Sequence, residues 1–163
     1  MLCALFKADY IPLKFKILVI CGQIEGGIGR HVVDFITHSV SYCDVHLVTN
    51  TGCAWVSQLE SIYQILPRDR VLHLPLTKKP SVADFDFFWK LKAYVKAHNI
   101  PVIVGHGAKG GAIARLVALT SEKTKSVYTP HGGALHYRWR SYGGFFYLLV
   151  EYFLKFKTDL IIF

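Results

Sequence analysis

The stretch Phe15-Lys-Ile-Leu-Val-Ile-Cys21, followed by the glycine-rich segment 22–29 (GQIEGGIG), decides the fold of this 163-residue chain. A short and almost continuous apolar run with β-branched residues predicts a strand that is buried on both faces, as in a parallel sheet. The glycines predict a tight turn. From Ile28 to Val40 the apolar residues then recur at helical spacing. The segment therefore predicts a strand, a turn and a helix in succession.

The rest of the chain repeats this alternation. Further strands are predicted at 45–49, 71–74, 100–104 and 126–128, with a sixth beginning at Asp159, and helices at 54–66, 82–98, 110–119 and 145–156. Alternating strands and helices predict a Rossmann-like α/β fold, with a mainly parallel sheet and helices on both faces. We expect residues 1–14 to be an N-terminal extension. Residues 15–163 form the domain, which we expect to be incomplete at its C-terminal end, because the chain stops within a strand.

Composition limits the classes of protein to consider. Apolar residues make up 52% and charged residues 18%, which excludes a disordered chain. The mean hydropathy of +0.32 indicates apolar surface that meets a membrane or a partner. No apolar run approaches the roughly 18 residues that would span a bilayer, and no secretory signal is apparent, so we expect a cytoplasmic protein. The net charge of +8 suits sugar nucleotides, lipid headgroups or nucleic acid.

Neither cysteine nor histidine spacing indicates a metal site. The four cysteines form no Cys-x-x-Cys pair, and no histidine pair follows them at zinc-finger spacing. We expect reduced and mostly buried thiols, no metal ligands and no metal cofactor.

Three loops should carry the chemistry, because ligands bind at the carboxyl ends of parallel strands. They are 22–30 (GQIEGGIGR), 105–111 (GHGAKGG) and 129–133 (TPHGG). The first lacks the third glycine and the acidic residue of a dinucleotide fingerprint, and the second lacks the Lys-Ser/Thr of a P-loop, so neither NAD nor ATP binding is supported. A glycine loop that opens a helix can bring backbone amides to an anion, although a tight turn without a ligand explains it equally well.

These segments together resemble the N-terminal domain of family 4 glycosyltransferases, which are two-domain enzymes of the GT-B fold. The resemblance covers the chain from about Lys16 to its end. It is carried by Glu25-Gly-Gly-Ile-Gly-Arg-His31, by 105–111 with Arg115, and by Val127-Tyr-Thr-Pro-His-Gly132 in this order and spacing. The final Thr158-Asp-Leu-Ile-Ile162 resembles the strand before the crossover between the two domains.

The resemblance also implies roles for individual residues. Gly26 and Gly27 would face the donor diphosphate and the acceptor. The loop from His106 through Lys109 to Gly110 would help to form the acceptor pocket. His131, followed by Gly132, matches the family's histidine at the active-site cleft. The larger part of the nucleotide site, with its carboxylate motif and its basic residue pair, would lie in a second domain.

Apart from the resemblance, the sequence context of these residues supports a functional role to different degrees. His131 lies between Pro130 and Gly132 after a strand, where a function is favoured over a structural hydrogen bond. For His106 the two interpretations are balanced. Lys109 is unusual at a helix start, where cations are disfavoured, and either a nearby anion or solvent exposure would account for it.

The remaining polar residues of these segments have simpler explanations. Arg30 and Arg115 are interpreted as members of ion pairs on a solvated face. Glu25 is interpreted as a surface turn residue, although it could orient an acceptor hydroxyl.

Two aromatic groups receive different interpretations. Phe85, Phe87, Phe88 and Trp89 are expected in the core. The region from Tyr137 to Lys157 interleaves aromatic and basic residues, which fits either a buried helix with exposed charged ends or contact with an anionic membrane surface. Nucleic-acid binding is not expected, since no recognised module accompanies the charge.

The sequence thus predicts the N-terminal half of a retaining glycosyltransferase. It would move a sugar from a nucleotide donor to a glycan or lipid-linked glycan and would be inactive alone, with a missing C-terminal domain or a companion chain as its partner. One alternative is a non-catalytic subunit of a split transferase. Another is an α/β domain that binds anions or nucleic acid.

Overall fold

The computed structural model describes residues 14–163 except 23, 25, 51–55, 77–80 and 132–141. Its centre is a six-stranded sheet in the order β3-β2-β1-β4-β5-β6, and every neighbouring pair is parallel. The strands are β1 (Phe15–Cys21), β2 (Cys43–Asn50), β3 (Val71–Leu74), β4 (Val102–His106), β5 (Lys125–Thr129) and β6 (Leu160–Ile161). The predicted Rossmann-like fold is confirmed.

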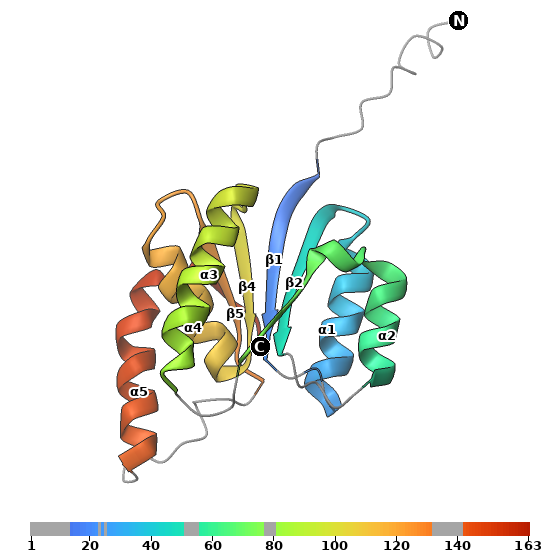
Figure 1. Cartoon of the computed structure of the whole chain (residues 1–163). Helices are drawn as coiled ribbons and strands as arrows, with labels where there is room; N and C mark the ends of the chain where they lie inside the picture. Colours follow the sequence, from blue (N-terminus) through green and yellow to red (C-terminus); the bar gives the residue numbers. More distant parts are fainter. Residues whose placement is uncertain (1–13, 23, 25, 51–55, 77–80, 132–141) are drawn as a thin grey trace, which may run out of the picture.

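Helices cover both faces of the sheet (Figure 1). They are α1 (Gly26–Ser39), α2 (Val56–Ile65), α3 (Ala83–His98), α4 (Gly107–Leu119) and α5 (Tyr142–Leu154), with short 3-10 turns η1 (Arg68–Arg70) and η3 (Lys155–Lys157). Side chains of α1 and α2 pack with β1, β2 and β3 in one apolar cluster. Those of α3 and α4 pack on the opposite face. α5 contacts α4, so it lies on the outside of that layer.

β4 begins two residues later than the sequence predicted. Asn99 ends α3 in the left-handed conformation, and the Ile100 N–H bonds to the Val95 carbonyl, so Ile100 belongs to the helix cap. The strand then extends to His106. This shift makes His106 the last residue of a strand, where the sequence had placed it in a loop.

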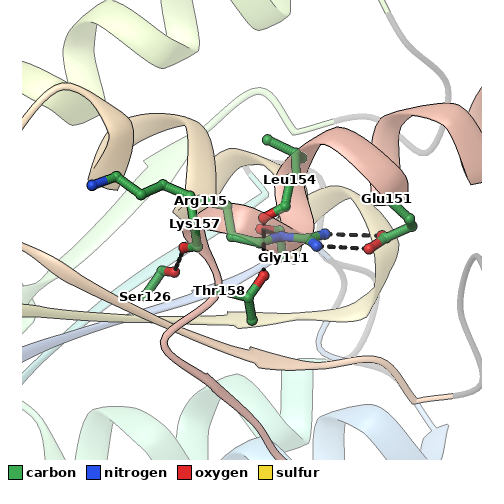
Figure 2. Close-up of polar contacts among 7 residues, drawn as sticks. All are labelled: Gly111, Arg115, Ser126, Glu151, Leu154, Lys157 and Thr158. Atoms are coloured by element: carbon green, nitrogen blue, oxygen red, sulfur yellow. Dashed lines mark hydrogen bonds and ion pairs between the residues drawn. The ribbon is translucent and has the colours of Figure 1, made fainter.

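Arg115 forms an ion pair, as predicted, but the prediction that it lies on a solvated face was wrong. Its side chain is 1% exposed, and two guanidinium nitrogens donate to the carboxylate of Glu151 in α5 at 2.6 and 2.9 Å (Figure 2). Its Nε donates to the Gly111 carbonyl, and the guanidinium lies 4.2 Å from the centre of the Tyr128 ring. The buried charge is therefore paired and hydrogen-bonded on every side, and it joins α5 to the sheet through α4.

The aromatic run at the start of α3 was only partly predicted. Phe87 is fully buried, with Leu91 and Val95 one and two turns further along. Phe85 and Trp89, however, are 70% and 48% exposed, so these two are not core residues. Because three consecutive aromatic positions cannot all face one side of a helix, periodicity could not decide which of them is buried.

Candidate functional site

The predicted chemical loops meet at the carboxyl edge of the sheet, which lies at the lower end of the strands in Figure 1. β4 lies between β1 and β5, and His106 is paired with Cys21 on one side and Thr129 on the other. His131 follows β5 by two residues. The first turns of α1 and α4 start at the same edge, since each helix follows a strand directly or after a short loop.

Three histidine side chains converge here from three separate elements. Nδ1 of His106 lies 2.9 Å from Nε2 of His131, so one of the two donates to the other. The ring centre of His31, from α1, lies 4.8 Å from that of His131 and 5.5 Å from that of His106. His106 is buried, His131 is half-buried and His31 is exposed, so the cluster runs from the core to solvent. Phe35 of α1 packs edge-on against His106.

The surroundings favour neutral imidazoles. Burial, with smaller contributions from His131 and His31, lowers the pKa of His106 to about 3. Burial also lowers the pKa of His131, and His31 adds to this effect. A neutral ring has a free lone pair, so His106 and His131 can accept hydrogen bonds or act as ligands near neutral pH.

His131 also adopts an uncommon backbone conformation. Its φ is 49°, in the left-handed region that residues other than glycine rarely adopt, although histidine is found there more often than most. Such a conformation costs of order 1–3 kcal/mol and is found most often at functional sites. The backbone of His131 therefore agrees with the function that its sequence context favours.

The glycines of this edge divide into two kinds. A side chain at Gly26, Gly27 or Gly107 would meet no described atom within 4 Å, and Gly26 and Gly107 have φ of 54° and 71°. By contrast, a Cβ at Gly110 would lie 2.8 Å from the Ile20 carbonyl oxygen, so close packing of α4 on β1 already requires a glycine there. The binding role of Gly110 remains a prediction.

Of the two explanations for Lys109, the structure bears out a nearby anion, which is a side chain of the protein itself. Its ammonium lies 2.7 Å from a carboxylate oxygen of Asp84 in α3. The pair ties the first turn of α4 to the first turn of α3, which accounts for a cation near a helix N-terminus without any ligand. Binding by Lys109 also remains a prediction.

Several predicted positions lie outside the described residues. They are Glu25, Gly132 and the basic aromatic segment 137–140. Conversely, His31 was not predicted as a site residue. The signal that could have identified it is its place in the second turn of a helix that begins at the carboxyl edge, next to the loops that hold the other two histidines.

A shallow groove of about 390 Å³ continues from His31 along α1. It is lined by His31, Asp34, Phe35, His38, Ser39 and Tyr42. The groove leaves the histidine cluster open on the α1 side, and Phe35 belongs to both features. An extended ligand could therefore lie along α1 with one end at the histidines.

α5 presents a second exposed surface. Glu151 and Leu154 face the protein, where Leu154 is buried and Glu151 binds Arg115. The opposite side of α5, continued into η3, is exposed, apolar and largely aromatic, at Phe145, Leu149, Tyr152, Phe153 and Phe156. The ammonium of Lys155 lies 3.9 Å from the centre of the Tyr152 ring. Within the described ranges, no helix has the length and apolar character needed to cross a membrane.

Comparison with solved structures identifies proteins of the same fold. The chain is similar to a Listeria monocytogenes protein assigned as a UDP-N-acetylglucosamine 2-epimerase (TM-score 0.64, 16% identity, 91% of this chain and 38% of that one). It is also similar to sucrose-phosphate synthase of Thermosynechococcus elongatus (TM-score 0.58, 18% identity, 91% of this chain and 42% of that one). A third similar structure is MurG of Acinetobacter baumannii (TM-score 0.56, 11% identity, 91% of this chain and 40% of that one). At these identities the likeness establishes the fold. The chain spans about two fifths of each of these proteins.

Sequence comparison supplies the family. No curated protein matches the chain. The model of Glycosyltransferase Family 4, however, matches residues 25–163, which include the three histidines, the first turns of α1 and α4, and all of α5. The chain therefore belongs to glycosyltransferase family 4, of which it has the Rossmann-like N-terminal domain.

Proposed function

We propose that residues 15–163 are the acceptor-side domain of a retaining glycosyltransferase that moves a sugar from a nucleotide donor to a glycan or lipid-linked glycan. The observation that carries the proposal is the convergence of His131, His106 and the uncrowded glycines Gly26 and Gly27 at one edge of the sheet. Backbone amides at the start of α1 can approach a diphosphate there, while the imidazoles meet the sugar and acceptor hydroxyls.

His131 is the residue we assign to the reacting groups. A half-buried imidazole with a lowered pKa is neutral near pH 7 and can accept a hydrogen bond or a proton from a sugar or acceptor hydroxyl. The fold fixes its orientation through the left-handed backbone and through the contact with His106. His106 acts as a positioning residue, because it is buried behind His131.

The groove along α1 is our candidate for the acceptor site. Aromatic rings such as Phe35 and Tyr42 provide flat apolar surfaces, and Asp34 and Ser39 provide hydrogen-bonding groups beside them. Pockets that combine apolar walls with a few polar groups are typical of small-ligand sites. Because the groove reaches His31, an acceptor bound in it would have its reactive end at the histidine cluster.

The proposal assigns the larger part of the donor site to a second domain, in a longer form of the chain or in a companion protein. Stabilisation of the leaving diphosphate by positioned charges is usually the largest catalytic contribution, and what we assign to it in the described part of this domain is the helix N-termini at the carboxyl edge. We therefore expect residues 1–163 alone to turn over no sugar nucleotide.

The test is to measure sugar transfer by residues 1–163 alone and joined to, or mixed with, a family 4 donor domain, with a chelator present. Activity should appear only with the second domain. His131→Ala should then lower the rate by roughly 10²-fold or more, as for loss of a proton-transfer group. His98→Ala, in the last turn of α3 and outside both the groove and the histidine cluster, is the control and should transfer sugar as the unsubstituted enzyme does. Rapid transfer by the isolated chain would refute the two-domain proposal, and full activity of His131→Ala would remove His131 from the site.

We also propose that α5 attaches the protein to the cytoplasmic face of an anionic membrane. Its exposed stripe combines aromatic rings with Lys155 and Lys157, the composition of helices that lie in the interface. A lipid-linked acceptor would be met at such a surface.

Vesicle binding tests this attachment. Each lysine near an anionic leaflet contributes about 1 kcal/mol, so a Lys155→Glu/Lys157→Glu variant should bind anionic vesicles at least tenfold more weakly. Binding should also fall with salt. A Lys90→Glu/Lys96→Glu variant of α3 has the same charge change and should bind as the wild type. Equal binding to neutral and anionic vesicles would contradict the proposal.

A further inference from the structure

We propose that His31, His106 and His131 form a binding site for a divalent transition-metal ion of the zinc type. This inference goes beyond the proposed glycosyl transfer and does not depend on it. It rests on the arrangement of three imidazoles that come from α1, from the end of β4 and from the segment after β5. Three histidines with a fourth position open to solvent are a familiar ligand set for zinc.

The distances fit a small adjustment of the side chains. One ligand nitrogen from each residue lies within 4.8 Å of the other two, and the His106–His131 nitrogens are 2.9 Å apart. Nitrogens bound to tetrahedral zinc at about 2.0–2.1 Å are about 3.3 Å from one another. The ion would therefore take the place of the proton that His106 and His131 share. His31 is exposed and can rotate inward to complete the set.

The burial of His106 is also consistent with a ligand at this position. The residue is 3% exposed at the end of β4. The fold keeps His106 in place although its Nε2 is buried without a hydrogen-bond partner among the described residues. An unsatisfied buried group costs about 1–3 kcal/mol, and such costs are tolerated most readily at functional positions.

The ligand types select the class of metal. Among the described residues the cluster consists of imidazoles and contains no carboxylate, whereas Mg²⁺ and Ca²⁺ prefer oxygen ligands. Zn²⁺, Co²⁺, Ni²⁺ and Cu²⁺ are bound well by imidazole. The sequence could not show this set, because its three members are 75 and 25 positions apart and share no motif.

A metal ion bound at this site would prevent His131 from acting as proposed in sugar transfer. A ring nitrogen that holds a metal cannot accept a proton, so zinc would inhibit sugar transfer by the complete enzyme. The metal site and the transfer function can therefore be tested separately: binding is measured on the 163-residue chain alone, and no substrate is needed.

The experiment is a titration of the purified chain with Co²⁺, read from the visible absorption of the bound ion, and with Zn²⁺ in competition with a chromophoric chelator. We expect one ion per chain. His31→Ala is the main variant, because an exposed side chain can be removed without unfolding the domain. It should weaken binding by roughly 10-fold or more, at least as much as loss of an outer partner does at known sites. His106→Gln and His131→Ala should do the same, with circular dichroism confirming that each is folded.

His38→Ala is the matched control, since His38 lies two turns from His31 on the same helix and bonds to the Asp34 carbonyl. It should bind as the wild type. The proposal is overturned if the wild type binds neither ion, if His31→Ala binds unchanged, or if His38→Ala loses as much affinity as His31→Ala.

Discussion

Two regions of this protein bury polar side chains, and they do so in opposite ways. Between α4 and α5, Arg115 is fully buried, yet Glu151, the Gly111 carbonyl and the Tyr128 ring satisfy it. At the carboxyl edge, His106 is buried almost as deeply but leaves one nitrogen without a described partner, and His131 beside it has a strained backbone. Satisfied groups and relaxed geometry indicate a structural role, whereas unsatisfied groups and strain indicate that the edge is shaped for a ligand.

The largest effect on stability is expected from substitution of Arg115. Arg115→Ala leaves Glu151 partly buried without its cation, and removal of one partner from a buried pair costs about 3–5 kcal/mol. We expect a correspondingly lower free energy of unfolding in urea. An Arg115→Met/Glu151→Leu double variant should recover much of the loss, because well-packed apolar residues replace buried pairs at little cost. A stable single variant would show that the pair is not structural.

The histidine edge should instead respond to pH. Because the pKa of folded His106 is about 3 and that of an unfolded histidine is about 6.5, the unfolded chain binds the extra proton between these values. Stability is therefore complete above pH 6.5 and falls as the pH is lowered, by about 2 kcal/mol at pH 5. The measurement is urea unfolding at pH 7.5 and pH 5 with a chelator present. His106→Asn should lose less stability than the wild type over this range, and an unchanged slope would mean that another group is responsible.

The smallest effect is expected at His131 itself. His131→Gly removes a side chain from a left-handed position, so relief of strain should offset the lost contacts, and stability should stay within about 1 kcal/mol of the wild type. Because the imidazole is gone, the same variant should transfer sugar more slowly in the two-domain enzyme and bind the metal ion more weakly. Thermal unfolding compares His131→Gly with His131→Ala, which keeps the strain and should be the less stable of the two. The reverse order would place His131 among the structural residues.

The sequence predicted the architecture well because each element carries its own signal. The apolar run of β1 and the alternation that follows it identified every strand, and parallel topology then brought the chemical loops to one edge. Long-range pairing was not predictable in the same way. Nothing near Arg115 indicates that Glu151 would reach it from α5, and nothing near Lys109 indicates Asp84.

The site was predicted in part for the same reason. His106 and His131 directly follow or end predicted strands, so their proximity could be inferred. His31 comes from the side of a helix, and its direction depends on where α1 begins. The sequence placed that start at Ile28, but the structure places it at Gly26. With α1 starting at Gly26, His31 falls in the second turn of the helix, where its ring meets those of His106 and His131.

The strand order has a consequence for synthesis of the chain. β1 pairs with β2 on one side, but its other edge pairs with β4, whose residues 102–106 are made much later. At about 5–20 residues per second, a ribosome needs several seconds to travel from the end of β2 to the end of β4. Throughout that interval an apolar strand edge is open to pairing with other chains. Aggregation of nascent or refolding protein should therefore begin at β1, and chaperones that cover this edge should raise the yield.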